Sequence, residues 1–496
     1  MKKKIRQIIA ITALLIQSLL GKPSPPNVSA PFMKNKPNPA LKRTISLDVG
    51  YLPSLNSNRA MGEFDFELRQ AWGGAYDYFH KIYQPTTLLG GVFLYGLFNF
   101  ATWGPTMGQM ATYHELGHAT RFRAIGIDTS FINIGKAAWG VYIKEGESLT
   151  LEDVLSDEYF PTVGGTVLVN AVLPAAFLLS AVMPRYDRSV LFKPRNEDNY
   201  YHPAALRLFK MIFSERLNEP YDSKKDKDLI LFEDFIMRTL QENMFAPVTD
   251  VLMNAGGLNN QQDQCRRVED NLWYSAGDHF ATVGTYFWDK TWAGFQSLSC
   301  LNGGYQDGQD TSRICNAYRR MGVYLTHEEI IKYSYLSYFL SAQTYANIYQ
   351  IYKTLTGEEN KVYAAEYGNI KLPNVGLYFT SKGPTYKVSL GYRYGENWFF
   401  PVGIEFGLKE SIWELMIGLR KKFPNFHDSF VHAEVVFNSA AAGGSVYGGV
   451  IWNQAWNIQA GFTYHNAKTF QGERNITSYK DGDTDIETWL KVGIVY

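Results

Sequence analysis

The last quarter of the chain alternates apolar side chains with other side chains at a period of two, from about residue 373 to residue 496. Tyr386, Val388 and Leu390, for example, alternate with Lys387 and Ser389. This period places successive side chains on opposite faces of a β-strand. The pattern predicts consecutive antiparallel strands at residues 375–380, 386–394, 402–409, 413–420, 431–437, 445–453, 456–464 and 486–496.

Eight antiparallel strands are enough to close a small barrel, which removes both exposed sheet edges. One face of the predicted strands is apolar and aromatic, and the other carries Gly, Ser, Arg, Glu and Lys. A soluble lipocalin-like barrel or a sandwich would turn the apolar face inward, whereas an outer-membrane barrel would turn it to lipid. The aromatic content of 15% and the terminal Tyr496, which resembles the C-terminal aromatic signature of bacterial outer-membrane barrels, favour membrane lipid as a partner.

The preceding residues predict an export signal and a helical domain. Residues 1–21 begin with Lys and Arg and continue into an apolar run, as in a secretory signal peptide. Residues 22–60 are expected to be a disordered lead, residues 61–360 a mostly helical domain, and residues 373–496 the barrel. The expected fold class is therefore α+β.

Two uncharged apolar runs, at residues 86–103 and 162–184, are either buried core helices or membrane spans. The 48 Lys and Arg residues balance the 48 Asp and Glu residues, so the charge gives no reason to expect a nucleic-acid partner.

Within the helical domain, residues 114–118 read His-Glu-Leu-Gly-His. Histidines four apart on a helix lie on one face, where both imidazoles can bind one zinc ion. Glu115 lies between them and can reach a zinc-bound water as a general base. Zn²⁺ bound by His114 and His118 is therefore the expected cofactor.

The residues after the motif carry a family resemblance. Arg123, Gly126-Ile127 and Ile134-Gly135 follow His118 at spacings that resemble the site-2 protease family of intramembrane zinc metalloproteases. A second apolar segment with Gly164-Gly165 and Asn170 is similar to that family as well. The resemblance covers roughly residues 88–255, and residues 114–135 are its specific part. It implies peptide-bond hydrolysis and a protein or peptide substrate.

The resemblance also implies a third zinc ligand, Asp250, at the end of a segment with Asn243 and Pro247. Val251 stands where the family has a glycine. The residues alone leave other third ligands open, namely Glu145, Glu147, Glu152, Asp153, Asp157, Glu158 and His279.

Together these patterns predict a zinc metalloprotease of the bacterial cell envelope, with the outer membrane favoured over the inner membrane. Site-2 proteases lie in inner or organelle membranes, so a barrel-like C-terminal region argues against carrying that location over. One alternative is a non-catalytic outer-membrane β-barrel protein with a helical domain. Another is a zinc hydrolase that acts on a non-peptide substrate.

Overall fold

The computed structural model describes residues 44–48, 247–275, 277–301, 310–355, 361–475 and 484–495, and shorter pieces between residues 58 and 201. The predicted signal peptide at 1–21 and the apolar run at 162–184 lie outside the described residues, as does most of the run at 86–103. No helix among the described ranges is both long enough and apolar enough to cross a membrane.

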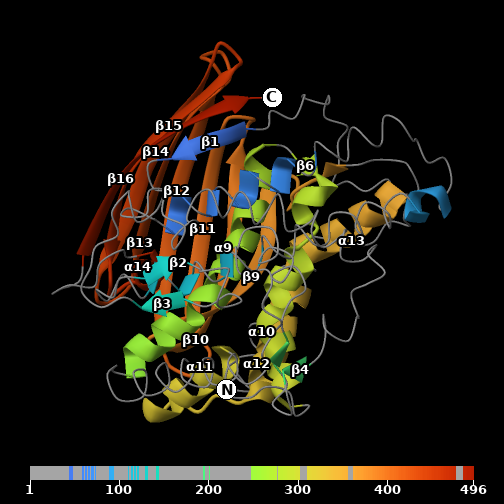
Figure 1. Ribbon diagram of the computed structural model, residues 1–496. Coiled ribbons are helices and arrows are strands. Elements are labelled where there is room, and N and C mark those ends of the chain that lie inside the picture. Colours follow the sequence, from blue (N-terminus) through green and yellow to red (C-terminus); the bar gives the residue numbers. More distant parts are fainter. Residues whose placement is uncertain are drawn as a thin grey trace, which may run out of the picture.

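An antiparallel sheet forms one side of the molecule (Figure 1). Its strand order is β1-β16-β15-β14-β13-β12-β11-β10-β9-β8. The strands are β1 (Thr44–Asp48), β8 (Glu366–Tyr367), β9 (Ile370–Thr380), β10 (Gly383–Tyr394), β11 (Trp398–Gly407), β12 (Trp413–Phe423), β13 (Ser429–Phe437), β14 (Ala442–Trp452), β15 (Trp456–Asn466) and β16 (Thr484–Val495). The eight strands predicted from the alternation correspond to β9–β16, and the α+β class is confirmed.

The sheet departs from the sequence expectation in two respects. Among the described residues no strand pairing joins its end strands β1 and β8, so the sheet is open and a closed barrel is not confirmed. β1 also comes from the segment expected to be a disordered lead, and Thr44–Asp48 pair with the end of β16. Five residues with only Ile45 and Leu47 as apolar members are too few for the alternation to stand out.

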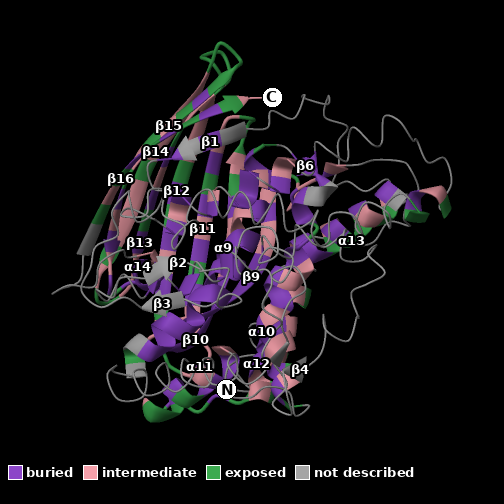
Figure 2. Cartoon of the chain, viewed as in Figure 1, coloured by how far each residue is buried: buried purple, intermediate pink, exposed green. Residues whose placement is uncertain are grey.

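The two faces of the sheet have the opposite polarity to a water-soluble sheet. Buried side chains on one face are largely polar, and they include Lys387, Glu405, Glu414, His432, Glu434, Asn457, Thr463 and Lys491. Exposed side chains on the other face are apolar, and they include Ile404, Trp413, Ile417, Leu419, Val431, Val435, Val446, Phe462, Ile486 and Leu490. In Figure 2 exposed residues alternate with buried or intermediate ones along the strands, and helix α9 (Pro247–Tyr274) is largely buried.

Five helices pack beside the β9 end of the sheet: α9 (Pro247–Tyr274), α10 (Tyr286–Leu301), α11 (Asp310–Arg320), α12 (His327–Phe339) and α13 (Ala342–Leu355). Of these, α9, α12 and α13 contact β9, and α10 and α11 contact α9. A short 3₁₀ helix, η3 (Phe280–Val283), precedes α10, and α14 (Phe470–Asn475) lies in the connection between β15 and β16. Small two-stranded pieces pair β2 (Thr129–Phe131) with β3 (Val141–Ile143), β4 (Pro194–Arg195) with β5 (Tyr200–Tyr201), and β6 (Asp278–His279) with β7 (Lys361–Val362).

Helix α9 is the central element because it contacts the sheet, α10 and α11. Pro247 suits the first turn of the helix, and Gly277 beyond its end has a φ of +110°, a conformation that favours glycine. Its run from Asn259 to Gln264 is polar yet fully buried. Val251, Ala255 and Leu258 join a core cluster with side chains from α11, α12 and β9. The apolar packing thus holds α9 in place, and its buried polar residues require partners inside the protein.

Candidate metal centre

His114 and His118 belong to a helical segment whose described residues fall between Met110 and Arg121. Their imidazole rings lie edge to face with centroids 4.9 Å apart, and the two Nε2 atoms are 3.2 Å apart. Both residues are at least nine-tenths buried. The two imidazoles therefore lie side by side, and their binding of one metal ion stays a prediction.

The motif segment crosses α9 with backbone against backbone. A Cβ atom on Gly117 would lie 2.2 Å from the carbonyl oxygen of Gly256, and a Cβ atom on Gly256 would lie 2.3 Å from the carbonyl oxygen of Gly117. The next residue, Gly257, leaves space for the imidazole of His114, because a Cβ atom at position 257 would lie 2.5 Å from Nε2 of His114. Glycine at these three positions therefore allows the histidines to lie directly against α9.

A backbone contact fixes the orientation of His118. Its Nδ1 lies 2.7 Å from the carbonyl oxygen of Met253 in α9. A carbonyl oxygen only accepts hydrogen bonds, so Nδ1 carries the proton and donates it. The other ring nitrogen, Nε2, faces His114 and Asp310. Metal-binding histidines in proteins commonly have this kind of outer partner.

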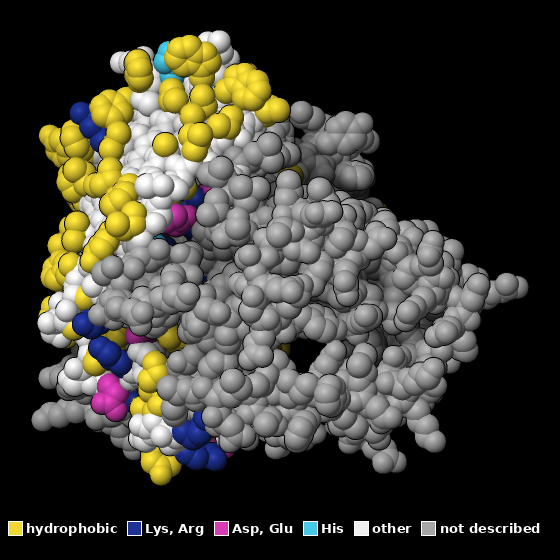
Figure 3. Space-filling view, turned by 60° about the vertical axis from the view of Figure 1, so that its left-hand side comes forward, with side chains coloured by type: hydrophobic (Ala, Val, Ile, Leu, Met, Phe, Trp, Pro, Cys, Tyr) yellow, Lys and Arg dark blue, Asp and Glu magenta, His cyan; other side chains and the backbone are white. Residues whose placement is uncertain are grey.

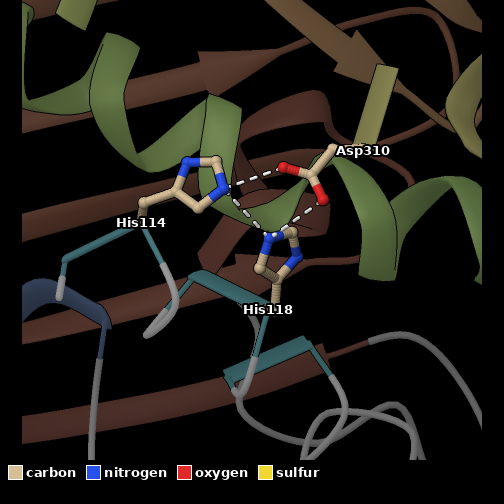
Figure 4. A group of neighbouring side chains, drawn as sticks. All are labelled: His114, His118 and Asp310. Carbon is tan, nitrogen blue, oxygen red and sulfur yellow. Dashed lines mark hydrogen bonds and ion pairs between the residues drawn. The ribbon is translucent and has the colours of Figure 1, made fainter. Parts of the chain in front are cut away.

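The third member of the cluster is Asp310, the first residue of α11 (Figure 4). Its Oδ2 lies 2.8 Å from Nε2 of His114, and its Oδ1 lies 3.4 Å from Nε2 of His118. Gln296 in α10 donates a hydrogen bond of 3.3 Å to Oδ2. Burial opposes ionisation of the Asp310 carboxyl, but His118 and His114 lower its pKa well below the ordinary value. One ligand atom from each residue lies within 4.8 Å of the others.

Asp250, the third ligand implied by the family resemblance, is not part of this cluster. Its carboxylate accepts a hydrogen bond of 2.7 Å from Asn254 and forms an ion pair with Arg320 at the far end of α11. Burial raises the pKa of Asp250, although Arg320 acts in the opposite direction. In the part of the chain that the structure describes, Asp310 and not Asp250 lies beside the two histidines.

None of the other candidate third zinc ligands joins the described cluster. His279 lies in β6, which pairs with β7, and it is not a member of the cluster. Glu115 lies outside the described residues, as do the remaining candidate ligands Glu145, Glu147, Glu152, Asp153, Asp157 and Glu158.

No strong sequence signal points to Asp310 as a ligand. Asp310 follows a segment rich in Gly and Gln and starts a helix, where an aspartate usually satisfies backbone N–H groups. It lies 192 residues after His118 in the chain, so spacing could not connect the two residues. Only the packing of α11 on α9 brings its carboxylate to the imidazoles.

The donor set agrees with a zinc ion. Two imidazole nitrogens and one carboxylate oxygen are ligands that zinc takes in catalytic sites, where a fourth position stays open for water. Two Nε2 lone pairs facing each other at 3.2 Å would repel unless a proton or a cation lay between them. The negative charge of Asp310 beside them favours a cation as well.

Comparisons of the chain with protein-family models, curated proteins and solved structures found no match. The resemblance to site-2 proteases therefore rests on residues 114–135 and stays a prediction.

Proposed function

We propose that the protein is a zinc-dependent peptidase of the bacterial cell envelope, with its sheet inserted in the outer membrane. The observation that carries the proposed activity is the convergence of His114, His118 and Asp310 within 4.8 Å. Together with the His-Glu-x-x-His pattern, this grouping supports a hydrolytic zinc site more than a structural one. A structural site would use four protein ligands, and three are found among the described residues.

In the proposed mechanism the protein residues have separate roles. His114, His118 and Asp310 would hold the zinc ion, which when bound polarises a water molecule and the carbonyl of the scissile bond. Glu115 would accept the proton of the attacking water and then deliver it to the nitrogen of the leaving amine. Met253 and Gln296 would keep the ligands oriented through their hydrogen bonds to His118 and Asp310.

The proposed location rests on the polarity of the sheet. Figure 3 shows hydrophobic side chains gathered along its outer side. Ile417 and Val435 are about half exposed there, on neighbouring strands, while Glu405 and Lys491 are buried on the opposite face. Exposing such a large apolar surface to water is unfavourable, whereas an apolar band facing lipid is typical of outer-membrane strands.

The activity is tested by replacing the proposed base. Purified full-length protein should bind one zinc ion per chain, measured by elemental analysis, and should cleave members of a peptide library. Glu115→Gln should abolish cleavage and keep the zinc, whereas Glu328→Gln on the exposed surface of α12 should change neither. Full cleavage by Glu115→Gln, or wild-type protein that binds no zinc, would overturn the proposal. Hydrolysis of esters or lipids but not of peptides would favour the non-peptide alternative.

The location is tested separately by adding a charge to the outer face. Ile417→Arg should reduce the yield of folded protein in outer-membrane fractions, because an arginine at the middle of the bilayer costs about 2–4 kcal/mol. Glu396→Arg, in the exposed turn between β10 and β11, should insert normally. Equal insertion of both variants, or recovery of the wild type in the water-soluble fraction, would contradict a membrane location.

A further inference from the structure

Helix α13 exposes its apolar side chains and buries its polar ones. Tyr345, Ile348, Tyr349 and Tyr352 are between 37% and 57% exposed, at the i, i+3, i+4 and i+7 spacing of a single helix face. The opposite face is polar and almost fully buried, and it consists of Gln343, Thr344, Asn347, Gln350 and Thr354. A helix on a water-soluble surface has the reverse arrangement.

Helix α10 has the same inverted polarity. Its buried residues include Asp289 and Lys290, which are each 2% exposed. Lys290 is satisfied inside the protein by Glu269 at 3.2 Å and by a carbonyl oxygen of β9. The partly or largely exposed residues of α10 are mostly apolar, and they include Phe287, Trp288, Trp292, Phe295, Leu298 and Leu301. At 1.5 Å per residue, this 16-residue helix is about 24 Å long, close to the roughly 25 Å apolar band of outer-membrane barrels.

These helices lie where the next strand of the sheet would be. Among the described strands, only β8 pairs with the outer edge of β9, and it pairs with the first two residues of β9 alone. Lys290 of α10 donates a hydrogen bond of 2.6 Å to the carbonyl oxygen of Val375. Ser341, between α12 and α13, accepts a hydrogen bond of 2.9 Å from the backbone N–H of the same residue. The inverted surface of the helices is therefore continuous with the sheet at this edge.

The charges near these helices are placed at the ends of an uncharged segment. Residues 333–352, from the middle of α12 almost to the end of α13, contain no Asp, Glu, Lys or Arg. Glu328, Glu329 and Lys332 precede this segment, and Lys353 follows it. Tyrosine is the most frequent side chain within it, and tyrosine is enriched at membrane–water interfaces.

We propose that α10, α12 and α13 face the lipid, so that the lipid-facing surface of the sheet continues beyond β9 on these helices. The occupant of their exposed face is then lipid, with acyl chains against α10 and the interfacial region against the tyrosines of α13. This inference rests on the membrane location proposed above and is independent of the metal centre. A partner protein fits less well, because the same inversion of polarity runs through the sheet and through two separate helices.

Spin labels on the full-length protein in liposomes of phosphatidylethanolamine and phosphatidylglycerol test the proposal. Cysteines are introduced singly as Ile348→Cys and Tyr352→Cys on the exposed face of α13 and as Asn347→Cys on its buried face. Ile417→Cys on the sheet and Glu396→Cys in a turn serve as lipid and water references. Wild-type protein carried through the labelling gives the background from the three buried native cysteines.

Collision rates of each label with oxygen and with a water-soluble nickel chelate report its surroundings. We expect labels at positions 348 and 352 to collide more with oxygen than with nickel, by a ratio that lies between those at positions 417 and 396, and the label at 347 to collide little with either. Nickel-dominated collisions at both 348 and 352 beside a lipid-exposed 417 would overturn this inference alone. Low rates at 348 and 352 that rise on dilution of the protein would overturn it in favour of a second copy. Nickel-dominated collisions at 417 would overturn the membrane location itself.

Discussion

The side-chain amide of Asn259 in α9 binds both backbone groups of Phe379 on the open edge of β9. Its Nδ2 donates to the carbonyl oxygen of Phe379 at 2.9 Å, and the N–H of Phe379 donates to its Oδ1 at 2.9 Å. The amide therefore replaces the backbone of a missing strand at this position. Oε1 of Gln262 likewise accepts a hydrogen bond from the N–H of Leu377, and the hydroxyl of Tyr318 donates one to the carbonyl oxygen of Thr380. The edge of the sheet is satisfied by helices, and α9 holds the edge of the sheet and the metal centre together.

Replacing Asn259 should destabilise the protein considerably. Asn259→Ala leaves a buried N–H and a buried carbonyl unpaired, at a cost of about 1–3 kcal/mol each, so we expect the free energy of unfolding to fall by about 2–6 kcal/mol. The measurement is denaturant unfolding in detergent, followed by tryptophan fluorescence. Asn369→Ala, at an exposed position just before β9, is the matched control and should change the stability little. An unfolding midpoint of Asn259→Ala equal to that of the control would show that water replaces the amide.

The strands β9–β16 could be predicted because each alternates for long enough to mark both faces. The open edge could not be predicted, since closure depends on what fills the space between the first and last strands. The run from Asn259 to Gln264 in α9 looks like a solvated segment in the sequence. Its burial depends on partners that are distant in the chain, such as Phe379 for Asn259 and Tyr378 for Asp263. Local sequence patterns do not indicate contacts between residues so far apart in the chain.

The close approach of Gly257 to His114 predicts that a single methyl group disrupts the metal centre. In Gly257→Ala the added Cβ would lie 2.5 Å from Nε2 of His114, so the imidazole must move away from the cluster. We expect zinc affinity to fall roughly 10–100-fold, the range typical of changes to the surroundings of metal ligands. Competition with a fluorescent zinc chelator measures this affinity.

Gly403→Ala in β11 is a suitable control for that experiment. Its added methyl group would meet side-chain atoms of Met416 and Lys387 at 3.2 and 3.4 Å, far less closely than in Gly257→Ala. We expect wild-type zinc affinity for this variant. Unchanged affinity in folded Gly257→Ala would show that His114 does not need its present position to bind zinc.

Asp310 at the start of α11 and Asp250 in α9, which pairs with Arg320 at the end of α11, can be compared directly as zinc ligands. Asp310→Asn removes a carboxylate that lies 2.8 Å from His114, so zinc affinity should fall by more than the Gly257→Ala variant loses. Asp250→Asn weakens the ion pair with Arg320 but leaves the cluster intact, so zinc binding should be retained. Isothermal titration calorimetry with zinc measures the zinc affinity of both variants and shows which aspartate is a ligand. Loss of zinc in Asp250→Asn with retention in Asp310→Asn would restore the third ligand implied by the site-2 protease resemblance.

Glu473 in α14 should make the stability of the protein depend on pH. Burial raises the pKa of its carboxyl to about 7 in the folded protein, against an ordinary value of 4.5, despite hydrogen bonds from Ser381. Below pH 4.5 the carboxyl is protonated in both the folded and the unfolded protein, so its burial costs no charge. Between pH 4.5 and 7 it ionises more readily in the unfolded protein, which lowers the free energy of unfolding. The loss reaches about 3 kcal/mol above pH 7.

Glu473→Gln keeps a hydrogen-bond acceptor for the N–H of Ser381 and carries no charge at any pH. We therefore expect its thermal unfolding temperature to exceed that of the wild type by more at pH 8 than at pH 5. Thermal scans of both proteins in the same detergent at the two pH values measure this difference. Glu396→Gln in an exposed turn is the control and should follow the wild type at both values. If the unfolding temperature of Glu473→Gln equals that of the wild type at both pH values, ionisation of Glu473 does not lower the stability of the folded protein. Its carboxylate in α14 must then be hydrated.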